Sequence, residues 1–310
     1  MISRRAVLSL AASAAFAKRA PWTLGANTAI DGYDLFRAIE TIRELGFRAI
    51  EIHPMGVPAA TPGRFPGFLF DRLSAADKSR IRRALAPFRH VTTHLPYTGW
   101  NWMSGDAAER EASIRAVETA MDATAYFGAR LAVLHPQPLP AGRENELRAA
   151  YLERFRTWGD RARKLGFRLA LETGYPRSIA AYTALIRDIG HPAIGSTIDV
   201  GHQSRYAELT ARVKPEERST PAGIRAYNDT TIAIAEQLGA KLFHLHVHDI
   251  DPATWQEHKP LVHGFVDYPR LFATLRKIGY KGILMLEIGG PASELPGWLR
   301  QAKQKLEEMS

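Results

Sequence analysis

Residues 243–251 read Phe-His-Leu-His-Val-His-Asp-Ile-Asp, so three histidines alternate with apolar residues. Alternation at a period of two is typical of a β-strand, which places His244, His246 and His248 on one face. Imidazoles on one face suit metal binding or proton transfer. The alternative is a half-buried strand whose histidines are satisfied by ordinary polar neighbours. The choice depends on whether other strands end in groups that match.

Several other apolar runs also end in an acid or an imidazole. Residues 131–134, 169–171 and 283–286 are apolar, and His135, Glu172 and Glu287 follow them directly. An ionised carboxylate in such a place costs several kcal/mol unless it is paired or bound to a metal. Each acid alone could form a structural ion pair, but all of them on one rim favour a divalent metal site. The polar groups at predicted strand ends are Glu51, His53, His94, His135, Glu172, Asp199, His202, His246, Asp249 and Glu287.

The elements that carry these residues alternate along the chain. Strands are predicted over residues 22–28, 47–53, 90–94, 130–135, 167–172, 193–199 and 282–288, besides the histidine strand. Helices are predicted over 32–45, 75–87, 107–127, 144–165, 179–189, 221–238, 267–278 and the C-terminal segment. About eight such units predict a (β/α)₈ TIM barrel, whose usual length is ~250 residues. Gly46, Gly166 and Gly279, each between a helix and a strand, suit helix caps.

A barrel gathers the carboxyl ends of its strands at one mouth, where these polar groups would meet. A doubly wound open sheet is the alternative fold, but no glycine-rich phosphate motif follows the first strand.

The N-terminus resembles a twin-arginine export signal. Arg4 and Arg5 precede an apolar run at residues 6–16. Small residues stand at positions 15 and 17, where the run ends. We expect residues 1–17 to be a signal peptide and residues 22–310 to form one barrel domain, in a periplasmic or secreted protein. A cytoplasmic N-terminal extension is the alternative.

Composition narrows the classes of partner and metal site. The chain is 45% hydrophobic and 24% charged, as in ordinary globular proteins, and has no apolar run near the ~20 residues that span a membrane. Its formal charge of +9 comes from scattered Lys and Arg, which indicates a solvated surface rather than a nucleic-acid interface. Because cysteine is absent, a metal must be bound by His, Asp and Glu.

Five short motifs resemble the xylose isomerase-like barrel superfamily, which holds sugar isomerases and epimerases as well as endonuclease IV-type DNA repair enzymes. They are residues 171–173 (Leu-Glu-Thr), 198–202 (Ile-Asp-Val-Gly-His), 246–249 (His-Val-His-Asp), 258–261 (His-Lys-Pro-Leu) and 286–287 (Leu-Glu). The resemblance implies that Glu172, Asp199, His246 and Glu287 bind one divalent ion, with Mn²⁺, Mg²⁺ or Co²⁺ favoured over Zn²⁺. His202 would face the substrate.

The implied chemistry is that of a sugar isomerase or epimerase. Three carboxylates and one imidazole form a hard site for an ion that chelates sugar oxygens and stabilises an enediolate. By resemblance, Glu172 and Glu287 are the catalytic base and acid. The expected partner is a small carbohydrate, and homo-oligomers are an open option. Weaker candidates for substrate contact are Glu51, His53, Trp100, Trp102 and Trp255, and loop packing is the alternative for the tryptophans.

Three other functions stay open at this point. His94, His135 and His258 resemble additional zinc ligands of the endonuclease branch, so more than one metal can be envisaged. However, Gln256 stands where that branch has an acid, with Glu257 displaced by one position. The same residues would also suit a metal-dependent lyase or hydrolase of keto-glycosides, or a non-catalytic periplasmic protein that binds sugar or metal.

Overall fold

A computed structural model describes residues 22–54 and 67–309 of the chain. The predicted signal peptide at residues 1–17 therefore lies outside the described residues. Within the described ranges, no helix is both long enough and apolar enough to cross a membrane.

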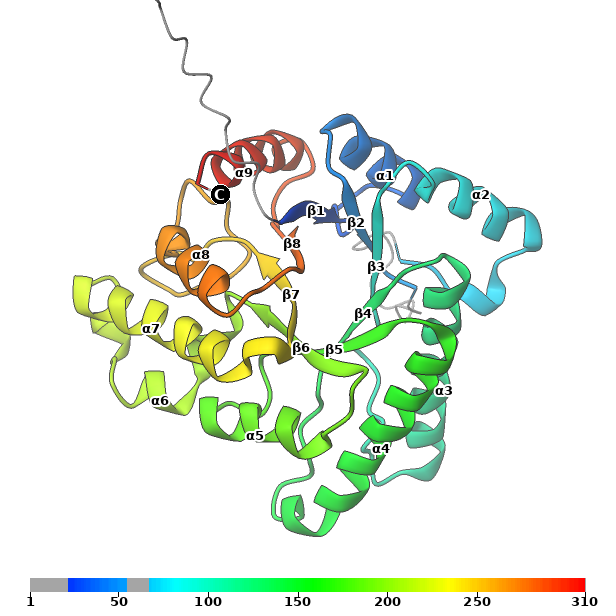
Figure 1. Ribbon diagram of the computed structural model, residues 1–310, viewed down its shortest axis with the longest axis horizontal. Helices are drawn as coiled ribbons and strands as arrows, with labels where there is room; N and C mark the ends of the chain where they lie inside the picture. Colours follow the sequence, from blue (N-terminus) through cyan, green and yellow to red (C-terminus); the bar gives the residue numbers. More distant parts are fainter. Residues whose placement is uncertain (1–21, 55–66, 310) are drawn as a thin grey trace, which may run out of the picture.

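Eight parallel strands form a closed barrel in the order β1 to β8, and β1 pairs with β8 to close it (Figure 1). This confirms the predicted (β/α)₈ fold and excludes the open sheet. The strands are β1 (Thr23–Asn27), β2 (Ala49–Ile52), β3 (His90–His94), β4 (Leu131–Leu134), β5 (Arg168–Glu172), β6 (Ile194–Asp199), β7 (Leu242–Val247) and β8 (Ile283–Leu286).

Helices surround the strands as an outer ring (Figure 1). They are α1 (Leu35–Glu44), α2 (Ala75–Leu85), α3 (Ala107–Tyr126), α4 (Glu144–Leu165), α5 (Ile179–Ile189), α6 (Ala207–Thr210), α7 (Pro221–Leu238), α8 (Tyr268–Lys277) and α9 (Leu295–Met309). Side-chain oxygens cap several N-termini by accepting a backbone N–H bond, as Ser178 does for α5. Gly166 ends α4 with φ 84°, and Gly46 and Gly279 also have positive φ, as the helix–glycine–strand pattern predicts.

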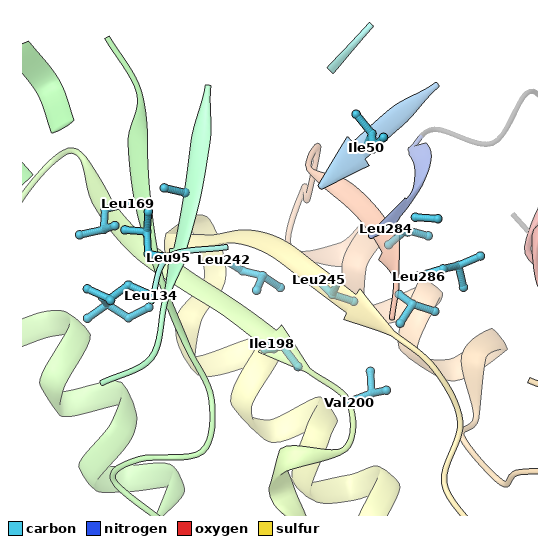
Figure 2. Packing of buried hydrophobic residues seen from close by; sticks show 14 of the residues in the cluster. Ile50, Leu95, Leu134, Leu169, Ile198, Val200, Leu242, Leu245, Leu284 and Leu286 are labelled. Atoms are coloured by element: carbon cyan, nitrogen blue, oxygen red, sulfur yellow. The ribbon is translucent and has the colours of Figure 1, made fainter. Parts of the chain in front are cut away.

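Most of the strand side chains directed at the helices are apolar, and they hold the strand ends in place. Ile198, Leu245 and Leu286 are all completely buried within the main hydrophobic core (Figure 2). Each directly precedes a polar site residue, so strand alternation turns the polar neighbour toward the barrel interior. Burial of the apolar face therefore fixes the direction of the site residues.

Strand β7 contains one irregularity next to the site. Ser196 of β6 pairs with Leu242 and Thr197 pairs with His244, so Phe243 is an extra residue in β7. A β-bulge of this kind re-aims the side chains that follow it. Phe243 packs with Leu131 of β4 inside the barrel, and His244 resumes the inward series that continues at His246.

Candidate metal centre

Four polar side chains converge at the carboxyl ends of four consecutive strands. Glu172 ends β5, Asp199 ends β6, His246 lies in β7, and Glu287 follows β8. One potential ligand atom of each residue lies within 4.8 Å of those of the other three. The structure therefore brings together the four residues that the sequence motifs single out, and we call them the quartet.

The imidazole of His246 is the centre of the quartet. Its Nδ1 atom lies 2.8 Å from Glu172 Oε1, 2.7 Å from Glu287 Oε2 and 3.9 Å from Asp199 Oδ2. Three carboxylates this close repel one another, and burial deprives them of water, so positive charge at this place stabilises the arrangement. Three oxygen donors and one nitrogen donor are ligands that Mg²⁺ and Mn²⁺ accept. The residues of the quartet fit a divalent metal ion.

The pKa values of the quartet show strong electrostatic coupling. Burial disfavours the charged form of His246, but Glu287, Glu172 and Glu51 outweigh it and hold the pKa of His246 well above its usual value. Burial likewise opposes ionisation of Glu287, yet His246 lowers the pKa of that carboxyl to about 2. Without an ion, the carboxylates are ionised at neutral pH and His246 carries a proton at the position that an ion would take.

Binding of a divalent ion should therefore release a proton from His246. Since its folded-state pKa is raised, the ring is protonated at pH 7, and metal affinity should fall about tenfold per pH unit on acidification. Calorimetric titration with Mn²⁺ in two buffers of different ionisation enthalpy measures the release. A His191→Gln variant, altered at a histidine that pairs with Asp160, is the control and should release the same proton. Equal heats in both buffers would contradict the assignment.

A further carboxylate, besides the three of the quartet, lies behind His246 on the side away from the quartet. Glu51 is fully buried, and its Oε1 atom lies 3.0 Å from His246 Nε2. Neither atom has an aligned hydrogen-bond partner among the described residues, while Thr92 Oγ1 donates to Glu51 Oε2 at 2.9 Å. Histidines that bind metals usually donate their other N–H to a carboxylate, which fixes the ring. The 3.0 Å contact places Glu51 for that task.

Substitution Glu51→Gln should weaken metal binding by about 10- to 100-fold, because a neutral amide is a poorer acceptor for the His246 N–H. The affinity for Mn²⁺ is measured by calorimetry or by electron paramagnetic resonance of the free ion. Thr92→Val is the matched control. It removes the hydroxyl that donates to Glu51 Oε2 but leaves the Glu51 carboxylate facing His246, so it should change metal affinity much less. Equal losses in the two variants would show that Glu51 acts only through packing.

The predicted substrate contact that directly follows β2 is also buried. His53 is 2% exposed, and its ring stacks on that of His94 at a centroid distance of 5.5 Å. Burial lowers the pKa of His53 to about 4, so this ring is neutral at pH 7. Direct substrate contact for Glu51 and His53 stays a prediction, and the contacts that the structure shows are with His246 and His94.

Three histidines surround Glu172 on its other side. His135 Nε2 lies 2.7 Å and His94 Nε2 3.2 Å from Glu172 Oε2. His202 Nδ1 bonds to the carbonyl oxygen of Thr173 at 2.6 Å. Burial opposes a charge on His202, but Asp199 and Glu172 raise its pKa to about 9. His135 and His202 are part-exposed and border the mouth, whereas His94 is buried.

A second group of metal-type ligands lies beside the quartet. Potential ligand atoms of His202, Glu257 and His258 lie within 4.8 Å of one another. Glu257 thus reaches this place although it is displaced by one position in the sequence. His248 is fully buried and its Nε2 bonds to Asp199 Oδ1 at 2.9 Å, so it supports a quartet member rather than facing the mouth.

The tryptophans differ from one another in placement. Trp102 is 1% exposed and packs against Tyr151 and Trp158, which favours the alternative of loop packing over stacking on a sugar. Trp255 is 4% exposed beneath the Arg218 guanidinium, which leaves little ring surface for a ligand. Trp100 is half-buried in its loop.

Asp249 forms hydrogen bonds to backbone groups of two loop segments. Its carboxylate accepts the N–H groups of Ile250 and Val266, and burial raises its pKa to about 6. Asp249 therefore holds the loop that follows β7 against the segment before α8.

Some residues at the mouth were missed by the sequence analysis. Tyr97 lines a cavity of about 260 Å³ together with Glu287 and His258. Arg177 and Arg205 line a second cavity of about 230 Å³ with His135 and His202. Their position shortly after strand ends is the only sequence signal that could have found them, because no motif contains them.

Comparison with solved structures gives a consistent result for the fold. A D-tagatose 3-epimerase-like protein superimposes with a TM-score of 0.69 at 18% identity, covering 93% of this chain and 96% of that one. A xylose isomerase-like TIM barrel protein from Mycobacterium smegmatis in complex with magnesium gives 0.63 at 20% identity, covering 93% and 96%. The 3-keto-D-glucoside 4-epimerase from E. coli gives 0.62 at 17% identity, covering 91% and 99%.

Sequence comparison agrees with this. An uncharacterized protein from Methanocaldococcus jannaschii is 22% identical over 207 residues, a match that covers 64% of each chain. The family model described as xylose isomerase-like TIM barrel matches residues 39–309, which include every member of the quartet. This chain belongs to the xylose isomerase-like TIM barrel family.

Proposed function

We propose that the protein is a divalent-metal-dependent sugar isomerase or epimerase that moves a proton on a carbon next to a carbonyl group. The observation that carries this proposal is the quartet, in which two glutamates approach one imidazole nitrogen from β5 and from the end of β8. Proton transfer between two faces of a planar intermediate needs an acid–base group on each side of the substrate, and a carboxylate can be such a group.

A bound divalent ion would polarise the carbonyl and hydroxyl oxygens of the sugar and so acidify the neighbouring C–H. Glu172 and Glu287 both have lowered pKa values, because His246 and other nearby histidines outweigh the effect of burial, and they are ionised at neutral pH. Each carboxylate can therefore accept a proton. Glu172 is also held by His94 and His135, which orient its second oxygen.

The names of structural neighbours support a carbohydrate substrate. One solved neighbour is D-allulose 3-epimerase from Methylomonas sp. in complex with D-allulose, and another is an L-ribulose 3-epimerase. The magnesium complex of the Mycobacterium smegmatis protein supports a hard divalent ion.

A solvent-exchange screen tests the proposal. The protein, loaded with Mn²⁺, Mg²⁺ or Co²⁺, is incubated in D₂O with D-allulose, D-fructose, D-tagatose and a 3-keto-glucoside. NMR should show deuterium on a carbon next to the carbonyl of at least one sugar, and no exchange after chelation. Metal-loaded protein that exchanges none of them would count against the proposal.

Three other functions remain distinguishable alternatives. The cluster of His202, Glu257 and His258 favours an endonuclease with several ions, which two or three bound zinc ions and cleavage of abasic DNA would reveal. Cavities on both sides of the quartet favour a lyase or hydrolase of keto-glycosides, which release of the aglycone would reveal. A protein that binds ion and sugar without exchange would be the non-catalytic binding protein.

We also propose export through the twin-arginine-type segment at residues 1–17. The support is the sequence pattern of Arg4, Arg5 and the apolar run that follows. Mass spectrometry of the protein from its native host should show a mature N-terminus near residue 18, in a non-cytoplasmic fraction.

A further inference from the structure

Two cavities flank the quartet, and their charged linings differ. The cavity beside β8 is lined by Asp31, Tyr97, His258 and Glu287, and no lysine or arginine borders it among the described residues. The cavity beyond β5 and β6 is lined by Arg177 and Arg205. We call the second one the arginine pocket.

The arginine pocket opens directly onto the site. His135 and His202 line it, and both lie against Glu172 of the quartet, at 2.7 Å and 3.8 Å from its carboxylate oxygens. A sugar that reacts between Glu172 and Glu287 can therefore extend past these two histidines. The cavity of about 230 Å³ holds a substituent a few atoms long.

The two arginines are presented by neighbouring segments of the mouth. Arg177 lies five residues after the end of β5, and Arg205 ends the short 3₁₀ helix His202–Arg205 after β6. The N–H of Ala207 donates to the carbonyl oxygen of Arg177 at 2.9 Å, which ties the two segments together. Both guanidinium groups thus border one cavity.

Neither guanidinium is neutralised by a protein acid. Within residues 22–54 and 67–309, neither Arg177 nor Arg205 forms a side-chain ion pair or hydrogen bond, whereas Arg270 pairs with Asp229 at 2.6 Å. Glu257 is the one acid lining the pocket within those ranges, and it faces His202 at 3.9 Å. The pocket therefore offers two free planar donors to a ligand.

We propose that the arginine pocket binds an anionic group, a carboxylate or a phosphate, at the end of the substrate remote from its reacting carbonyl. Guanidinium forks match the oxygens of both groups in paired hydrogen bonds. The opposite cavity, with Asp31 and Glu287, repels an anion, so the charges also set the direction in which the sugar lies. This inference rests on the proposed function, because it deepens that function to acidic sugars.

Binding without turnover tests the pocket first. D-gluconate and D-sorbitol differ by a carboxylate in place of a hydroxymethyl group, and calorimetry or NMR measures both with the metal-loaded protein. Gluconate should bind at least about tenfold more tightly, as expected for a charged hydrogen-bonded pair. The Arg177→Gln/Arg205→Gln double variant should remove this preference and leave sorbitol unchanged.

Arg115→Gln is the surface control, since it removes one positive charge from the outer helix α3 by the same substitution, and it should behave as the unchanged protein. A gluconate preference that persists in the double variant would show that the carboxylate binds the metal instead, which overturns the proposal. Equal affinity for gluconate and sorbitol in the unchanged protein overturns it as well.

Exchange measurements in D₂O then answer two separate questions: whether the anionic group is a carboxylate or a phosphate, and whether the proposed reaction takes place. D-fructose, D-fructuronate and D-fructose 6-phosphate share a keto group and differ at the sixth carbon. Lower KM for fructuronate alone indicates a sugar acid, and lower KM for the phosphate indicates a phosphosugar. Exchange with all three at equal KM refutes the pocket and upholds the proposed function. Arginine-dependent gluconate binding without any exchange upholds the pocket and refutes that function.

Discussion

A Glu172→Gln variant should lose sugar proton exchange by about 10³-fold or more, because it removes a group that accepts the proton and a ligand oxygen. The substitution keeps the shape of a side chain that is 1% exposed and held by His94, His135 and His246. NMR of deuterium incorporation measures the loss, and circular dichroism checks that the barrel is folded.

The comparison variant is Glu287→Gln, which changes the acid on the other side of His246. It should lose epimerisation to a similar degree, since one carboxylate cannot serve both faces of the sugar. Glu236→Gln, altered at a surface acid that pairs with Lys277, is the control and should keep full activity. Full activity in both quartet variants would refute the proton-transfer roles.

Removal of the metal should lower the melting temperature by several degrees. Ligand binding to the folded state alone stabilises it by about 2.7 kcal/mol at 100 times Kd, and for a domain of this size each kcal/mol is worth about 2–4 °C. The physical reason is the repulsion among Glu172, Asp199 and Glu287, which nearby histidines with raised pKa values, such as His246 and His202, offset only in part. Calorimetric scans with and without chelator measure the shift.

An Asp199→Asn variant provides the control for this shift. Because it lacks one ligand charge, its melting temperature should respond less to chelation than that of the unchanged protein. A chelator that leaves the melting temperature of the unchanged protein untouched would contradict metal binding at the quartet.

Much of the barrel could be predicted from the sequence because local signals there are strong. Helix α4 was predicted with its observed bounds, since Gly166 ends it in a conformation that glycine adopts most easily. Glu172 and Glu287 stand out because each closes an apolar run, and such a run specifies a buried strand whose end is at the mouth.

Two features could not be predicted from such local signals: the position of a side chain within the barrel, and the direction in which a loop turns its side chains. Glu51 and His53 resemble in sequence the polar residues that end other strands, but only the closed barrel shows that Glu51 lies behind His246 and that His53 stacks on His94. Trp102 lies in a loop, and nothing local shows that the loop turns it into the core. Glu257 reaches His202 because the loop twists through positive φ at Trp255 and His258.

The members of the quartet come from four adjacent strands, β5 to β8, and none comes from β1 to β4. An ion there would link one half of the barrel directly from strand to strand, whereas the other half would touch the quartet only through side chains such as Glu51 and His94. Binding of the ion should therefore suppress local unfolding more in strands β5 to β8 than in strands β1 to β4. Amide hydrogen exchange should slow on metal addition in residues 168–172, 194–199, 242–247 and 283–286, and change little in the first four strands.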